Sequence, residues 1–301
     1  MIAQDQGFFG AELFVDDTRF LVHHTDFIAL GYYFRGASNK PFLASVVGPS
    51  GRNMVDAQPS DHAHHRGIWW GHGDVNGVDY YLEVPKVGED HPIGTIVHLG
   101  FDTIVDANPV FGFVEQLEWR EPSGVVAIIE RRALRLDLSR DDRCTLDLES
   151  TYTAVTDLAF GDTKESTLPG VRLAERLTVN GGGRMVNSRG GVGEAECFGQ
   201  PAEWVDHSVF RRGVYWKEYT EGIAIFDHPE NPHHPAVWFT RDYGPQSPFE
   251  GHHFIGADTM AAGDALTVRH RILVHEGDAE AADVAGAYAE YSGEATEQGA
   301  S

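Results

Sequence analysis

The chain has 301 residues, 42% of them hydrophobic and 11% aromatic, which is enough apolar material to bury a large core and argues against a disordered protein. Acidic residues outnumber basic residues by 46 to 23, and the formal charge of −23 argues against nucleic acid and membrane surfaces as partners. No apolar run approaches the ~18 residues of a membrane span, and the first residues lack the features of a signal peptide, so we expect a cytoplasmic protein. Cys144 and Cys197 form no CxxC pattern and are expected to be buried thiols.

Alternation of apolar and polar residues with a period of two dominates the chain and predicts antiparallel strands with one wet face. In chain order we predict strands at Gly10–Val15, Phe27–Phe34, Thr95–Val105, Phe111–Trp119, Leu134–Leu138, Cys144–Ala154, Val171–Val179, Val214–Tyr219, Gly222–Asp227 and Leu266–His275. Short turns at 120–124 and 139–142 predict hairpins. One helix is predicted at Ala279–Tyr291.

No linker or repeat divides the chain, which predicts an all-β protein built as one large antiparallel β-sandwich with a short C-terminal helix. We expect residues 1–291 to form a single domain and residues 292–301 a flexible C-terminal tail. The less regular stretches are 47–80, 160–170, 181–208 and 227–253, and they are rich in His, Asp, Arg and Trp. In a β-sandwich such loops carry the chemistry.

Residues 61–79 form the densest polar cluster, with four histidines, four glycines, two tryptophans and three aspartates. Imidazole acts as acid, base or metal ligand near neutral pH, and indole faces suit the C–H side of a sugar ring. A tight loop whose histidines satisfy one another is the structural alternative, but the density favours a functional site. We predict His65 and His72 as catalytic residues, and as ligand-binding residues His64, Arg66, Trp69, Trp70, Asp74 and Asn76.

A second cluster, residues 160–165, places Asp162 and Glu165 on either side of Lys164. A carboxylate beside a pocket can take a proton from a hydroxyl, and a neighbouring lysine can stabilise charge on oxygen. We predict Asp162 or Glu165 as the catalytic base and Lys164 as a binding residue. The alternative is an exposed turn with a weak surface ion pair.

Polar side chains later in the chain complete the predicted pocket. Arg241 could grip a carboxylate or vicinal hydroxyls, although it could equally pair with Asp242 and fix a loop. The remaining predicted binding residues are Asp206, His207, His228 and Asp242. The 16 histidines make a divalent metal possible, although no helical metal motif is present and no other cofactor is expected.

Several segments resemble a bacterial family labelled PmoA, or methane oxygenase. The resemblance follows the chain in order at His64–Asp79, Phe160–Glu165, Trp204–His207, Gly222–Pro232, Trp238–Gly244 and Leu266–Gly277. The particulate methane monooxygenase subunit of that name is an integral membrane protein, and this chain contains no membrane span. The resemblance therefore implies a large sandwich similar to galactose mutarotase and other sugar-binding supersandwich proteins.

Three functions follow from these observations. The leading hypothesis is a carbohydrate-active enzyme that moves protons at an anomeric or carbonyl carbon, by epimerisation, elimination or hydrolysis, with His65 or His72 as the acid. The second is a non-catalytic sugar-binding protein, and the third is a metal-dependent oxygenase, as the family label suggests. The first requires the segments around positions 65, 72, 165, 207 and 241 to meet in one polar cavity.

Overall fold

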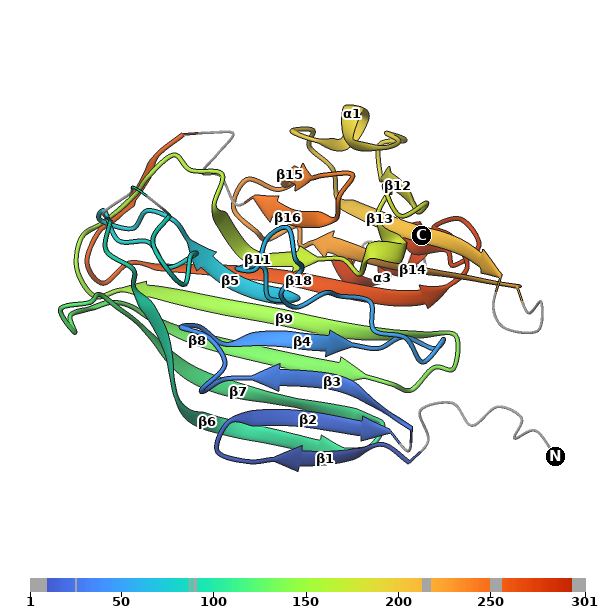
Figure 1. The fold of residues 1–301 in the computed structure, drawn as a ribbon, viewed down its shortest axis with the longest axis horizontal. Helices are drawn as coiled ribbons and strands as arrows, with labels where there is room; N and C mark the ends of the chain where they lie inside the picture. Colours follow the sequence, from blue (N-terminus) through green and yellow to red (C-terminus); the bar gives the residue numbers. More distant parts are fainter. Residues whose placement is uncertain are drawn as a thin grey trace.

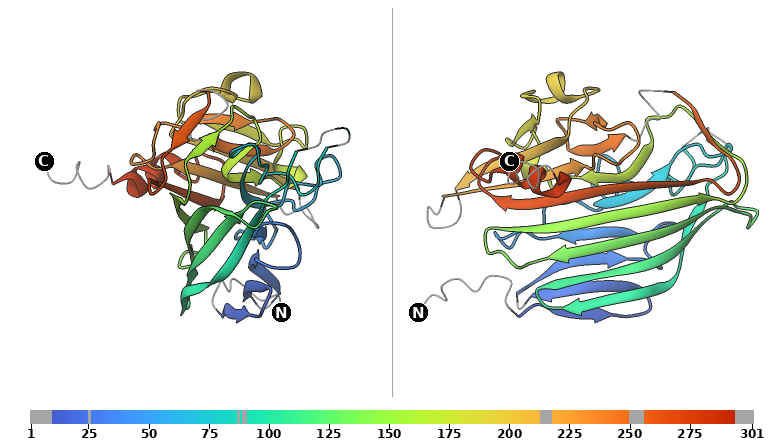
Figure 2. Two further views of the ribbon diagram at one scale, coloured as in Figure 1. Left: turned by 90° about the vertical axis from the view of Figure 1, so that its left-hand side faces the viewer. Right: turned by 180° about the vertical axis from the view of Figure 1, so that it is seen from behind.

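The computed structural model describes residues 10–24, 26–86, 88, 91–212, 218–249 and 256–293. It contains two eight-stranded antiparallel sheets stacked face to face (Figures 1 and 2). The first sheet has the order β1 (Glu12–Val15), β2 (Arg19–His24), β3 (Phe27–Tyr33), β4 (Phe42–Val46), β5 (Ile68–His72), β11 (Ser166–Arg172), β16 (Pro245–Phe249) and β15 (Val237–Thr240). The second has the order β12 (Arg184–Asn187), β13 (Trp204–Arg212), β14 (Glu218–Asp227), β18 (Ala265–Glu276), β9 (Arg143–Ala154), β8 (Val126–Asp137), β7 (Val110–Arg120) and β6 (Thr95–Ala107). This architecture confirms the predicted all-β sandwich.

The smaller elements lie at the ends and on the outer faces of the sheets. Two short strands, β10 (Leu158–Phe160) and β17 (Asp258–Met260), pair with each other. The helical elements are η1 (Glu175–Leu177), α1 (Glu194–Cys197) and α3 (Val284–Ser292). None of the helices in the described part of the chain is both long and apolar enough to cross a membrane.

The strands follow from the alternation in the sequence. Along β9 every second side chain is buried, so its inward residues pack between the sheets and its outward residues meet solvent. The predicted turns at 120–124 and 139–142 connect β7 to β8 and β8 to β9 in register. One hydrophobic cluster fills the space between the sheets and includes Phe20, Trp70, Phe113, Trp119, Leu136 and Ile225.

A buried polar network interrupts this core between β3, β6, β7 and β8. Arg132 lies 2.8 Å from the Glu130 carboxylate and 3.7 Å from the Glu115 carboxylate, and all three side chains are fully buried. His98 Nδ1 lies 2.6 Å from the other oxygen of Glu115. Trp119 Nε1 donates a 2.8 Å hydrogen bond to Glu130, so every charge in the network has a partner.

Helix α3 covers part of the outer face of the second sheet and starts later than predicted. Val284 and Tyr288 pack against Phe226 and Leu273. Residues 279–283 form turns, and Asp283 caps the helix by accepting a 3.1 Å hydrogen bond from the Gly286 amide. Ser292, assigned to the tail, belongs to this helix, and residues 294–301 lie outside the described residues.

Other boundaries also differ from the prediction. The strand predicted at 171–179 is shifted: β11 ends at Arg172, and residues 175–177 form η1, because buried Leu173 and Leu177 face the core from a turning chain. Residues 214–217 of another predicted strand lie outside the described residues. The segment 47–80, expected to be irregular, contains β5, whose five residues are all buried.

Candidate functional site

Strand β5 distributes the predicted site residues between two faces of the first sheet. Ile68 and Trp70 belong to the core between the sheets, whereas Trp69 packs on the outer face with Phe42 and Tyr81. His72 has the same parity as Ile68 and therefore points inward. The prediction that His65 and His72 act in one cavity is wrong, because His65 stacks on Trp69 on the outer face.

A group of seven side chains, which we call the histidine cluster, lies on this outer face. It consists of Asp61, His62, His64, His65, Tyr81, Arg172 and Tyr243. Its rings form a continuous stack: Tyr243 on His62 at 5.2 Å, His62 on His65 at 4.8 Å, and His65 on Trp69 at 4.9 Å, with interplanar angles of 18°, 13° and 20°. His62 and His64 are half-buried, and His65 is buried beneath them.

Hydrogen bonds define the protonation of His65. Arg172 Nη1 lies 3.3 Å from His65 Nδ1, and because a guanidinium only donates, Nδ1 must be the acceptor. The ring proton is thereby assigned to Nε2, which lies 3.3 Å from the Tyr81 hydroxyl. The other amino group of Arg172 donates to both oxygens of Asp61, at 2.9 and 2.8 Å.

Burial and neighbouring charges set the ionisation of the cluster. Burial, together with the nearby rings of His64 and His62, lowers the pKa of His65 to about 2. Burial also lowers the pKa of His64 to about 4. Although burial opposes it, hydrogen bonds from Arg172 and His62 lower the pKa of Asp61 to about 2. At neutral pH His64 and His65 are therefore neutral, and Asp61 is ionised beside His62, whose Nδ1 lies 3.0 Å away.

Glu165 lies at one margin of the cluster. Its carboxylate accepts a 2.7 Å hydrogen bond from Lys86 Nζ and a 3.2 Å bond from the Thr163 hydroxyl. Burial opposes ionisation, but these partners lower the pKa of Glu165 below its usual value. The charges of Glu165 and Lys86 both act on His64. The two predicted clusters are therefore close to each other on this face.

A polar hollow of about 310 Å³ opens beside Glu165. It is bounded by Gly73, Asp74, Asp79, Lys86, His91 and Thr163 among other residues. The Gly73 amide donates a 2.6 Å hydrogen bond to the Glu165 carbonyl, and Ser166 pairs with His72 across β11 and β5. The histidine-rich segment and the 160–165 segment are therefore neighbours, as predicted.

Several predicted binding residues hold the surrounding loops. Arg66 donates hydrogen bonds from Nε and Nη2 to the two carboxylate oxygens of Glu83. Asn76 donates to the Asp157 carbonyl at 3.0 Å and accepts from the Ala159 amide at 2.7 Å. Asp74 accepts a 2.9 Å hydrogen bond from the Gly77 amide. Trp70 packs against the Arg132 guanidinium in the core. Asp162 and Lys164 are exposed in the loop before Glu165.

The residues predicted around position 207 lie elsewhere. Asp206 and His207 alternate on β13, so they point to opposite faces of the second sheet. Asp206 pairs with His275 at 2.8 Å on the side covered by α3, and His207 lies 3.4 Å from the Thr240 hydroxyl inside the sandwich. Both are fully buried, which separates them from the histidine cluster.

His228 and Arg241 also serve local structure. His228 packs edge-on against Tyr291 of α3, at 5.1 Å, on the outer side of the second sheet. Arg241 pairs with Glu194 of α1 at 2.9 Å rather than with Asp242, and Asp242 accepts a 3.1 Å bond from the Glu194 amide. Arg241 still borders the histidine cluster, because its guanidinium lies 5.9 Å from the Tyr243 ring.

The structure adds site residues that sequence reasoning missed: Asp61, His62, Tyr81, Lys86, Arg172 and Tyr243. Asp61 and His62 belong to the dense cluster in the sequence, so composition indicated the region but not these roles. Arg172 and Tyr243 are more than 100 residues away in the chain, and only the pairing of β11 with β5 and β16 brings them close. Within the described residues, no group of three His, Cys, Asp or Glu side chains is arranged to hold a metal ion.

The fold and this face define an antiparallel β-sandwich protein with a histidine- and carboxylate-bearing surface on one sheet. The chain belongs to the family of unknown function DUF6807, which matches residues 12–289. That description carries no activity, and the resemblance to proteins labelled PmoA stays a prediction. A comparison with curated proteins gave no match.

Solved structures provide distant similarities. The chain is similar to a galactose mutarotase related enzyme from Lactobacillus acidophilus, at 7% identity and a TM-score of 0.35, over 88% of this chain and 97% of that chain. It is also similar to a polysaccharide lyase, at 10% identity and a TM-score of 0.30, over 89% of this chain but only 32% of the lyase. At these TM-scores the similarities carry no argument about function, which depends on the chemistry of the site.

Proposed function

We propose that the outer face of the first sheet binds a carbohydrate and catalyses proton transfer at its anomeric or carbonyl carbon. The observation that carries this proposal is the presence, on one face, of three ionisable groups in different surroundings. These are the ionised Glu165, the neutral His64, and His62 backed by the ionised Asp61. Acid–base chemistry on a sugar needs a base and an acid near one ring.

In this proposal Glu165 is the base. It removes a proton from a sugar hydroxyl or an acidic C–H group. His62 delivers a proton to the ring or carbonyl oxygen from Nε2, and Asp61 stabilises its imidazolium form at Nδ1. His65 cannot serve as the protonated acid, because its pKa of about 2 keeps it neutral. It orients Tyr81 instead.

Two buried polar atoms support a ligand on this face. Trp69 Nε1 and the Thr167 hydroxyl have no hydrogen-bond partner in the described structure. Thr167 pairs with Gly71, so its side chain shares the outer face with Trp69. Buried donors without partners are costly, and a ligand hydroxyl would satisfy them.

The test is a turnover screen of the full chain with neutral and acidic mono- and disaccharides, followed by NMR. For a substrate found in this way, we expect Glu165→Gln and His62→Gln each to lower kcat by about 10²-fold or more, since general acid–base catalysis contributes that much. The matched control is His23→Gln, at an exposed position on β2, which should keep full activity.

The outcomes separate the candidate functions. Saturable sugar binding without turnover would favour a non-catalytic sugar-binding protein over an enzyme. Turnover that survives both substitutions would remove Glu165 and His62 from the mechanism. An absence of sugar binding would refute the proposal.

A further inference from the structure

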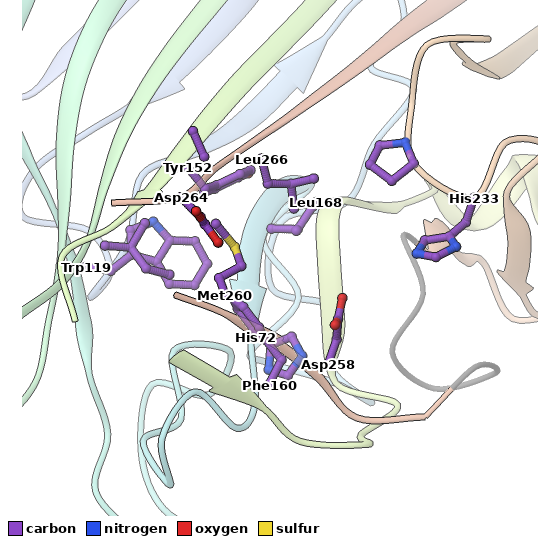
Figure 3. A pocket seen from close by; sticks show the side chains of 13 residues that line it. His72, Trp119, Tyr152, Phe160, Leu168, His233, Asp258, Met260, Asp264 and Leu266 are labelled. Atoms are coloured by element: carbon purple, nitrogen blue, oxygen red, sulfur yellow. The ribbon is translucent and has the colours of Figure 1, made fainter. Parts of the chain in front are cut away.

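A second hollow opens between the two sheets, and Figure 3 shows the side chains that line it. His72 of β5 borders this hollow, whereas the histidine cluster lies on the other face of β5. Its volume is about 290 Å³. Inward side chains of both sheets form its walls, among them Trp119, Ile128, Tyr152, Leu168 and Leu266. Phe160 of β10 and Met260 of β17 border it as well.

The cavity is large for a protein interior. Interiors pack as densely as organic crystals, and voids larger than a water molecule are few. A volume of about 290 Å³ instead approaches the lower end of small-molecule sites, which start at roughly 300 Å³. Trp119 and Tyr152 meet edge to face at 5.8 Å, and Phe160 meets His72 in the same way at 5.3 Å, so aromatic rings surround the space. The walls suit a single flat ring.

Carboxylates are the acidic groups in the described lining of the cavity, and His72 and His233 are its basic side chains. Asp258 and Asp264 are exposed at its border, and the described lining contains neither lysine nor arginine. Each carboxylate has one oxygen engaged by a backbone amide, from Thr259 and Ala261. The whole chain carries a charge of −23, which adds to the negative potential. Anions are therefore disfavoured and cations favoured at the mouth.

His72 is held in a fixed orientation by a hydrogen bond from its own chain segment. Its Nδ1 accepts a 3.0 Å hydrogen bond from the Asp74 amide, so the ring proton of the neutral form is on Nε2. Figure 3 shows His72, Asp258 and Asp264 among the side chains that line the cavity. A ligand with an apolar ring inside and a cationic group at the carboxylates matches both parts of the lining.

We propose that this cavity is a binding site for a small organic cation, an amine attached to a single apolar ring. The ring lies between Trp119, Leu168 and Leu266, and the ammonium group pairs with Asp264, which Figure 3 shows on the side of Trp119. The site is independent of the carbohydrate site, since β5 separates the two.

Three probes of equal size and different charge test this proposal on the full chain: benzylamine, benzyl alcohol and benzoate. We expect benzylamine to bind about threefold more tightly than benzyl alcohol, as one exposed ion pair would provide, and benzoate not to bind. Asp264→Asn should weaken benzylamine about threefold and leave benzyl alcohol unchanged, whereas Asp258→Asn, on the other side of the cavity, should have a smaller effect on benzylamine. Titration by NMR or calorimetry measures these affinities.

Two further variants locate the site. Leu266→Trp, at a half-buried inward position in the cavity wall, should block binding of benzylamine and benzyl alcohol alike. Asp106→Asn removes an exposed carboxylate at the far end of β6 and should change nothing. Equal affinity for benzylamine and benzyl alcohol would overturn the cation assignment. Binding that persists in Leu266→Trp, or no binding of any probe, would overturn the site.

Discussion

At the scale of single residues, burial rather than residue type decides what the histidines can do. His65 is a hydrogen-bonded neutral ring wedged between His62 and Trp69, whereas His62 keeps a solvent-accessible edge and a carboxylate partner. The same imidazole is therefore a structural spacer at position 65, whereas at position 62 it can take the role of proton donor that we propose. Sequence alone cannot separate these roles, because burial depends on the surrounding strands.

The low pKa of His65 predicts how stability changes with pH. Unfolded His65 takes up a proton below its ordinary pKa of 6.5, whereas folded His65 stays neutral down to about 2. The contribution of neutral His65 to the free energy of unfolding is therefore fully present above pH 6.5, and it is lost as the pH falls below that value. Between pH 7.5 and 5 the loss from this residue is about 2 kcal/mol, since one pKa unit corresponds to about 1.36 kcal/mol.

Urea unfolding of wild type and His65→Gln at both pH values measures this contribution. The substitution should flatten the pH dependence, whatever it does to stability at pH 7.5. His23→Gln, on an exposed part of β2, should keep the wild-type slope. Identical slopes for wild type and His65→Gln would contradict the proposed neutral, buried state.

At the scale of elements, β5 depends on a close approach of two chains just before its first residue. Gly67 has φ +74°, and a Cβ built on it would overlap the carbonyl oxygen of Leu43 on β4. Its amide donates to Asp56 at 3.0 Å, and its carbonyl accepts from Arg172 at 2.7 Å. One glycine thus anchors β5 and carries Arg172 toward His65.

Gly67→Ala should cost about 3 kcal/mol or more in free energy of unfolding, because the left-handed conformation costs about 1–2 kcal/mol and the backbone overlap adds to it. The matched variant is Gly124→Ala in the β7–β8 turn, where φ is +89° but nothing lies within 4 Å of the added Cβ. For Gly124→Ala the free energy of unfolding should fall only by the cost of the left-handed conformation, about 1–2 kcal/mol. Denaturant unfolding compares the two, and equal losses would show that the overlap with Leu43 is relieved without cost.

The elements also show what the sequence could predict. Long strands with one wet face, such as β8 and β9, follow directly from their alternation, and the hairpins follow from their turn residues. Strand β5 could not be predicted in this way, because all five of its residues are buried, on both faces of the sheet, and so do not alternate between apolar and polar. The site was divided for the same reason, since the parity of β5 places His72 on one side of the sheet and Trp69 on the other.

At the scale of the whole molecule, the two sheets are joined by charge as well as by apolar packing. Arg132 lies between Glu115 and Glu130 in the middle of the sandwich. Its Nη1 also donates a 3.1 Å hydrogen bond to the hydroxyl of Tyr32 on the opposite sheet. Alternation predicted that one face of β8 is wet, but not that two of its charged residues point inward. Their pairing with each other, and with groups on other strands, makes this burial possible.

Arg132→Met should destabilise the protein by about 3–5 kcal/mol, because it leaves two buried carboxylates without their cation. Arg135→Met, on the same strand, removes an arginine that is 48% exposed and pairs with Asp137, and it should cost less than about 1 kcal/mol. Thermal or denaturant unfolding of the two variants provides the comparison. A loss of similar size in both would mean that the Arg132 network contributes no more than a surface ion pair.

The placement of tryptophans on different sides of the first sheet has a practical consequence. Trp69 lies under the histidine cluster, and Trp119 lines the interior cavity. The chain has six tryptophans, and emission from each indole is sensitive to its immediate surroundings. A change in emission on ligand binding that disappears when Trp69 alone, or Trp119 alone, is replaced by phenylalanine therefore reports on one compartment. Occupancy of the two hollows can then be followed separately, without attaching a dye.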